Sequence, residues 1–322
     1  MHQRWFGLLA AGILFFTSIQ SQAVVLYRTP TRNTAAPSGT LYNSGWQWEG
    51  KWGGFLGTPI APNYFITAGH VGGGVGQTFT FNYKPYTTTG MWDDPNSDLR
   101  IYKVNANFPA YAPLYTQPYE IGKQMVVIGR GSQRGSEVRV SNELKGWKWG
   151  YSDAIQSWGE NVVSGTPYGG TGSGSLLQFT FSRVGGLYNE AELTGGDSGG
   201  GVFIKDGTTW KLAGINKSVE SFLSMTGGTG SGFNAAVFDA GGLYFGGDGH
   251  WRLVPNGSAD VQASSYATRI SSNMSWIRSV LGSSMPRTAL STSGSSATFV
   301  PEPSSIAMLA VAALGLWRRR RF

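Results

Sequence analysis

Residues 64–71 read YFITAGHV, an apolar run followed by small residues and a histidine. The apolar part predicts a buried strand, and the step to His70 would place an imidazole at the rim of a barrel. Other short β-rich runs follow, and the chain carries 48 glycines. Regular short strands with glycine punctuation favour β-barrels or sandwiches, so we expect an all-β chain.

The expected strands lie at residues 54–60, 64–67, 78–83, 99–104, 125–129, 137–140, 175–182, 201–204 and 210–216. A proline-bearing stretch at 108–118 divides them into two parts, because proline cannot donate to a strand ladder. One helix is predicted from about Ser265 to Leu281, with apolar residues recurring on one face and Gly282 as a stop.

The first 23 residues have the order of a secretory signal peptide. Arg4 precedes an apolar stretch, and Ser21-Gln22-Ala23 supplies the small residues that signal peptidase needs, so cleavage is expected after Ala23. A buried N-terminal helix is the alternative.

The C-terminal end contains Pro301-Glu302-Pro303, an apolar run at 306–317 and then Arg318–Arg321. The run is short for a bilayer core of about 30 Å, and a basic cluster would hold its end in the cytoplasm. A plain C-terminal transmembrane helix is the alternative. Residues 284–299, rich in Ser, Thr and Ala, are interpreted as a flexible linker.

This tail, residues 300–322, resembles the PEP-CTERM sorting signal of Gram-negative bacteria. The resemblance implies export across the inner membrane, membrane contact through the C-terminal segment before processing, and cleavage by an exosortase-type enzyme. The expected destination is the cell surface or the extracellular matrix.

Charge and cysteine content exclude several kinds of site. Without the two terminal signals, 20 basic residues stand against 17 acidic ones, so the excess charge does not indicate a nucleic-acid partner. The chain has no cysteine, which excludes disulfides, thiolate metal sites and cysteine nucleophiles. Stability must therefore come from packing.

The strongest chemical motif is GGDSGG at residues 195–200. A nucleophilic serine needs an exposed hydroxyl on a tight turn, with backbone N–H groups aimed at the developing oxyanion, and flanking glycines permit that approach. An ordinary β-turn is the alternative for this motif alone. A serine also needs a base, and His70 fits that role; the rival His250 lies in a glycine-rich surface loop.

The third group required is a carboxylate that fixes the imidazole tautomer. Asp98 stands at the start of the alternating strand 99–104 and is the first candidate. Asp93 and Asp94 are the rivals, but they belong to a Trp-Asp-Asp-Pro turn, where capping or solvation is the ordinary role.

In residue type and order, Thr67–His70, Asp98-Leu99 and Gly196–Gly200 resemble the motifs of chymotrypsin/trypsin-like serine proteases. The resemblance implies two six-stranded antiparallel β-barrels and a C-terminal α-helix within residues 24–283, with a catalytic cleft between the barrels. It also implies an oxyanion hole formed by the backbone N–H groups of Gly196 and Ser198.

The resemblance leaves two questions, which are the partner of Asp197 and the role of Glu192. In many members a new N-terminus beginning Ile-Val-Gly-Gly pairs with the aspartate before the serine, and nothing near Val24 has that form, so another partner is expected for Asp197. Glu192 falls six residues before Ser198, where trypsin-like members carry the carboxylate that selects Lys or Arg. It would either line the substrate-specificity pocket or point to solvent.

These observations lead to a secreted, surface-sorted serine endopeptidase that acts on proteins or peptides as a monomer, without a cofactor or metal. One alternative is a non-catalytic surface protein that binds partners on a protease-like scaffold. A serine esterase or lipase of another fold would carry its acid and histidine after the serine, and the order here is the reverse.

Overall fold

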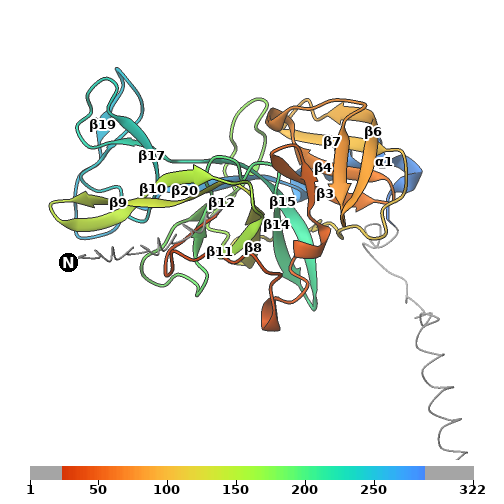
Figure 1. Cartoon of the computed structure of the whole chain (residues 1–322), viewed down its shortest axis with the longest axis horizontal. Coiled ribbons are helices and arrows are strands. Elements are labelled where there is room, and N and C mark those ends of the chain that lie inside the picture. The colour runs from red at the N-terminus through yellow and green to blue at the C-terminus, as the bar shows by residue number, and fades with distance from the viewer. Residues whose placement is uncertain (1–23, 287–322) are drawn as a thin grey trace, which may run out of the picture. The chain divides into compact units, whose positions relative to one another are not determined.

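The computed structural model describes residues 24–286 (Figure 1). The expected signal peptide, almost all of the expected linker and the sorting tail lie outside the described residues. The described part is mostly β, with three six-stranded sheets and one α-helix.

The first sheet closes into a barrel with the strand order β2-β3-β4-β7-β6-β5. Its strands are β2 (Gly50–Trp52), β3 (Phe55–Ala61), β4 (Tyr64–Ala68), β5 (Thr78–Phe81), β6 (Lys84–Asp93) and β7 (Leu99–Val104). Aromatic rings fill its interior: Phe65 stacks on Phe79 with ring centroids 3.9 Å apart, and on Tyr102 at 5.1 Å. Burying such rings is a large apolar contribution to stability, consistent with a core that has no disulfides.

The second sheet has the order β11-β8-β14-β15-β20-β12. Its strands are β8 (Gln124–Gly129), β11 (Ser157–Val162), β12 (Leu176–Thr180), β14 (Gly201–Asp206), β15 (Thr209–Val219) and β20 (Ser264–Arg269). Within residues 24–286 no ladder joins β11 to β12, so the sheet is a half-barrel, and the expected second closed barrel is not found. The two strands that come directly after β8 along the chain, β9 and β10, belong to the third sheet.

The third sheet was not foreseen from the sequence beyond residues 137–140. Its order is β19-β18-β16-β17-β10-β9, and Figure 1 shows β9, β10, β17 and β19 in a lobe away from the first barrel. The strands are β9 (Ser132–Val140), β10 (Glu143–Ser152), β16 (Phe222–Ser224), β17 (Gly232–Val237), β18 (Tyr244–Phe245) and β19 (Arg252–Leu253).

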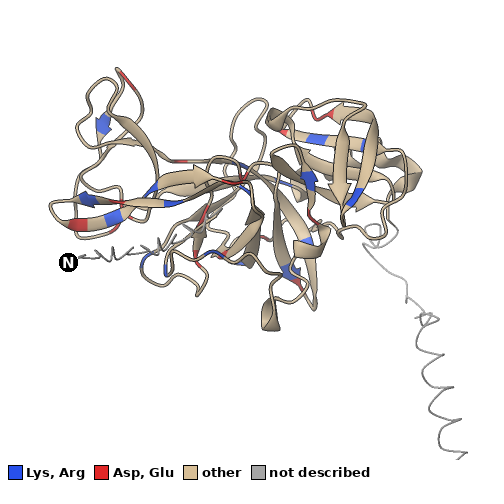
Figure 2. Ribbon diagram, viewed as in Figure 1, with Lys and Arg blue, Asp and Glu red and all other residues tan. Residues whose placement is uncertain are grey.

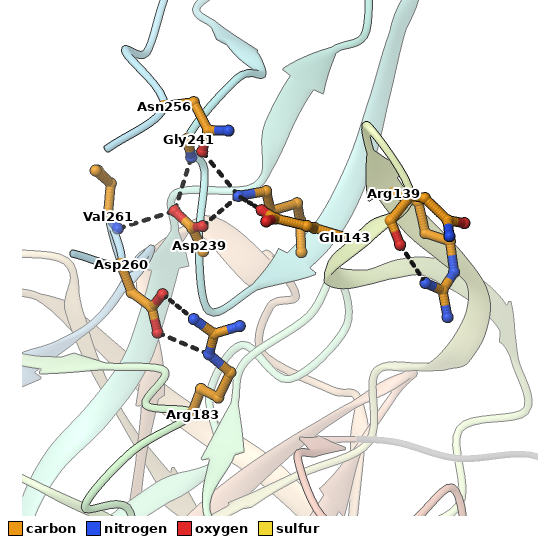
Figure 3. A network of polar contacts seen from close by, with 10 residues as sticks. Arg139, Glu143, Arg183, Asp239, Gly241, Asn256, Asp260 and Val261 are labelled. Atoms are coloured by element: carbon orange, nitrogen blue, oxygen red, sulfur yellow. Dashed lines mark hydrogen bonds and ion pairs between the residues drawn. The ribbon is translucent and has the colours of Figure 1, made fainter. Parts of the chain in front are cut away.

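A buried polar network ties the loops of this lobe to β10 (Figure 3). The Lys145 side chain is 2% exposed, and its Nζ lies 2.5 Å from Asp239 Oδ2 and 2.9 Å from Asn256 Oδ1. The other Asp239 oxygen accepts hydrogen bonds from the backbone N–H groups of Gly241 and Val261. Every polar atom of this buried pair is thus directed to a partner, which fixes the loops on either side of it.

The predicted helix is a strand in its first part. Residues 264–269 form β20, which pairs with β12 on one side and β15 on the other, and α1 covers only Met274–Leu281. Two ladders of backbone hydrogen bonds outweigh the helical pattern there, and Tyr266 and Thr268 suit a strand. The predicted apolar face is confirmed, because Ile270, Met274, Ile277 and Leu281 are all buried.

Figure 2 shows Lys and Arg interspersed with Asp and Glu over the described strands. Between residues 24 and 286, no helix has both the length and the apolar character needed to cross a membrane. The apolar run at 306–317 lies outside the described residues.

Candidate active site

Three side chains from separate segments meet between the first barrel and the half-barrel. His70 lies in a 3₁₀ turn (η3, Gly69–Val71) after β4, Asp98 precedes β7, and Ser198 lies in the turn between β13 (Ala191–Glu192) and β14. His70 Nδ1 is 2.6 Å from Asp98 Oδ2, and His70 Nε2 is 2.8 Å from Ser198 Oγ. The three predicted residues therefore form one continuous hydrogen-bonded chain.

The pairing of β4 with β7 fixes the first half of this chain. Ala68 is opposite Leu99, and the Gly69 N–H donates to the Asp98 carbonyl at 2.7 Å. The His70 backbone N–H donates to Asp98 Oδ1 at 2.9 Å, while Oδ2 faces the ring. Because a carboxylate only accepts, the ring proton sits on Nδ1, which leaves Nε2 free to accept from the Ser198 hydroxyl.

The rival residues are engaged elsewhere. Asp93 pairs with Arg100 and its side chain is 52% exposed. Asp94 accepts hydrogen bonds from the Asn96 N–H and the Ser97 hydroxyl, as expected for a turn residue. His250 is exposed in a turn of the third-sheet lobe, where its N–H donates to the Gly247 carbonyl.

Glycines allow the serine turn to fit closely between the two sheets. Gly199 has φ +80°, and a Cβ there would lie 2.4 Å from Thr67 Oγ1. A Cβ at Gly200 would lie 2.0 Å from the Ile128 carbonyl oxygen. Neither position could accept a larger residue without moving the turn, so these glycines are needed for the placement of Ser198.

The two backbone N–H groups expected to form the oxyanion hole belong to Gly196 and Ser198. Gly196 has φ +100°, a conformation that favours glycine. Among residues 24–286 no acceptor takes a hydrogen bond from the backbone N–H of Gly196 or Ser198. Two neighbouring N–H groups beside a half-buried serine could therefore stabilise an oxyanion.

Asp197 lies behind the serine and is 1% exposed. It accepts hydrogen bonds from the Gly131 N–H at 2.7 Å and from the N–H and hydroxyl of Thr194 at 2.7 and 2.9 Å. Gly131 and Thr194 are thus the other partners expected for Asp197, and the backbone of Val24 donates to it as well. Val24 reaches this place because Val25 and Leu26 form β1, which pairs with β13. Burial raises the pKa of Asp197 to about 6, although these hydrogen bonds lower it.

A chain cut after Ala23 would begin at Val24 and carry its α-ammonium beside Asp197. Compared with a chain that keeps Ala23, we expect the Val24 form to be more stable at pH 7 by about 3 kcal/mol, because a buried carboxylate gains an ion-pair partner. The advantage should shrink as the pH falls below about 6, where Asp197 takes up a proton. Thermal unfolding of the two forms at pH 5 and pH 7 measures this, and equal stability at both pH values would contradict it.

A pocket of about 230 Å³ opens beside Ser198. Its walls include Trp149, Thr194, Lys217, Ser218 and Val219. Such a pocket next to the hydroxyl could hold one side chain of a bound peptide.

The specificity role expected for Glu192 does not match its position. Glu192 is 1% exposed in β13 and is not among the residues that line this pocket. Burial raises its pKa well above the usual range, so the neutral acid is favoured. Within the described residues no cation lies at ion-pair distance from it. In the ladder between β13 and β1, Glu192 lies opposite Val25, a pairing that the sequence spacing alone could not show.

Sequence reasoning missed Val24, Trp149 and Lys217 at this site. Val24 directly precedes β1 and Trp149 lies in β10, and neither strand carries a motif in the sequence. Lys217 was marked only by its place directly after the expected strand 210–216. Within residues 24–286, no group of three or more His, Asp and Glu residues is arranged to hold a metal ion.

Comparison with known proteins identifies one segment. A family model of the PEP-CTERM protein-sorting motif matches residues 299–321. The chain is therefore a secreted protein that is sorted to the surface of a Gram-negative bacterium. The motif also implies processing by an exosortase-type enzyme. No curated protein matches the sequence.

Proposed function

We propose that this chain is a secreted serine endopeptidase of the chymotrypsin/trypsin-like type. The observation that carries the proposal is the hydrogen-bonded chain from Asp98 through His70 to Ser198. The closed first barrel, the adjoining half-barrel and the C-terminal helix are compatible with that family.

In the proposed first step, Ser198 Oγ attacks the carbonyl carbon of the scissile peptide bond while His70 Nε2 takes the hydroxyl proton. Asp98 stabilises the imidazolium that forms. The backbone N–H groups of Gly196 and Ser198 would hold the negative oxygen of the tetrahedral intermediate, and one such donor is worth about 3–4 kcal/mol.

The intermediate then collapses as the imidazolium gives its proton to the leaving amine, which breaks the C–N bond and leaves an acyl group on Ser198. In the second half, His70 takes a proton from water as the water oxygen bonds to the acyl carbon. The acyl C–Oγ bond then breaks, and the imidazolium returns its proton to Ser198 Oγ, which releases the carboxylic acid. The pocket beside Ser198 would hold the side chain that precedes the cleaved bond.

A fluorophosphonate probe tests this proposal directly on the purified 24–299 fragment. We expect covalent labelling of the native protein and loss of labelling after heat denaturation, because only an activated hydroxyl reacts quickly. Mass mapping should place the label on Ser198. Ser218 and Ser221 line the same pocket and are internal controls.

A native, folded protein that takes no label and cleaves no member of a peptide library would contradict the proposal. It would favour a non-catalytic surface protein that binds partners on this scaffold. The same library gives the specificity of the pocket. Because Glu192 is buried and does not line the pocket, we expect no trypsin-like preference for Lys or Arg.

A further inference from the structure

Lys217 in β15 places a positive charge against the proposed catalytic acid. Its Nζ lies 3.7 Å from Asp98 Oδ2, the same oxygen that faces His70 Nδ1 at 2.6 Å. The Lys217 side chain is 18% exposed and the Asp98 side chain 10%. One carboxylate oxygen thus lies between a lysine ammonium and the imidazole.

A β-bulge directs this side chain. In the ladder between β15 and β20, Asn216 is opposite Ala267 and Ser218 is opposite Tyr266, so Lys217 is the extra residue. Bulges of this kind turn a side chain away from its regular direction and are frequent beside active sites.

The residue before the bulge is locked to the serine turn. Asn216 is fully buried, its carbonyl accepts from the Gly199 N–H at 3.0 Å, and its Nδ2 donates to the Asp197 carbonyl at 3.1 Å. The position of Lys217 is therefore coupled to that of Ser198 and does not depend on a flexible loop.

Other charges near His70 are turned away or already paired. Arg100 of β7 is held by Asp93. Asp94 faces Ser97, and Asp197 lies behind the serine, hydrogen-bonded to Gly131 and Thr194. Among the described residues, Asp98 and Lys217 are thus the charged groups that bear directly on the imidazole.

We propose that Lys217 is a positioning residue that acts on His70 through Asp98 and extends the activity toward lower pH. This inference rests on the proposed function. A fixed positive charge 3.7 Å from Asp98 Oδ2 offsets part of the attraction of this carboxylate for a positively charged imidazole. We therefore expect the wild type to stay active at a lower pH than a variant without the ammonium.

The test is the pH dependence of kcat/KM from pH 5 to pH 9 for the wild type, Lys217→Met and Lys217→Arg. Removal of the ammonium should move the acid limb upward by about 1 pH unit, so that kcat/KM falls about tenfold on that limb. Each profile is normalised to its own high-pH plateau, because Lys217 also lines the pocket beside Ser198 and its replacement can change peptide binding equally at every pH. The arginine variant should keep the wild-type limb.

Lys211→Met is the matched control, since Lys211 lies on the same strand and pairs with Asp206. It should leave the profile unchanged. The pH dependence of the fluorophosphonate labelling rate is a second readout. If Lys217→Met does not fold, Lys217→Gln removes the charge with a polar side chain.

Superimposed acid limbs for the wild type and a folded, uncharged variant would overturn the role of Lys217 while leaving the proposed hydrolase intact. An equal loss at every pH would also overturn it, because that result indicates a structural role. A wild type that neither hydrolyses peptides nor takes the label would remove the proposed function, and this inference with it.

Discussion

Replacing Ser198 by alanine is expected to lower peptide hydrolysis by about 10⁶-fold, because no other group supplies the attacking oxygen. The free energy of unfolding should change by no more than about 1 kcal/mol, since the change removes one half-buried hydroxyl whose partner, the His70 ring, can bind water instead. Initial rates on a cleaved library peptide and thermal unfolding of the same sample measure the two effects.

Ser218→Ala is the matched control because Ser218 lines the same pocket without contacting His70. It should change the preference among peptides more than the rate of labelling. An alanine variant at 198 that hydrolyses peptides at the wild-type rate would refute the proposed nucleophile. Loss of activity that is explained by unfolding would not support it.

Asp98→Asn should lower kcat by about 10⁴-fold, as loss of the triad carboxylate does elsewhere. An amide at this position offers an N–H group where the Asp98 carboxylate now accepts from His70 Nδ1 at 2.6 Å, so the ring proton would be favoured on Nε2. Nε2 could then no longer take the proton of Ser198. The measurement is kcat at a pH on the activity plateau.

Asp93→Asn provides the comparison for this variant. Asp93 forms an exposed ion pair with Arg100, and exposed pairs contribute at most about 1 kcal/mol. Its hydrolysis rate should stay within about twofold of the wild type. A comparable loss from both variants would show that the effect belongs to the folding of this segment and not to the imidazole.

The grouping of His70, Asp98 and Ser198 could be predicted because each stands at the end of a strand or in a glycine-rich turn with a recognisable pattern. The structure brings the three together, while their catalytic role stays a prediction. Four strands of the first barrel could be predicted for a similar reason, because they are short apolar runs that follow one another closely along the chain. Its strands β2, which has three residues, and β6, which carries few buried residues, were not predicted.

Long-range pairings explain what the sequence did not indicate. Residues 264–269 pair with β12 on one side and with β15 on the other. These two ladders stabilise a strand there, although the sequence pattern is that of a helix. Glu192 lies opposite Val25 of β1, which is 167 residues earlier in the chain (192 − 25). Lys217 acquires its direction from a bulge, and a bulge has no composition signal of its own.

The stacked rings inside the first barrel have a consequence for maturation outside the cytoplasm. The chain has no thiols, and the rings of Phe65, Phe79 and Tyr102 pack together in the interior of the barrel. Its folding therefore needs no catalyst of disulfide formation. Its native state should form equally well in aerated and anoxic surroundings, and reductants released by neighbouring cells have no covalent cross-link in it to break.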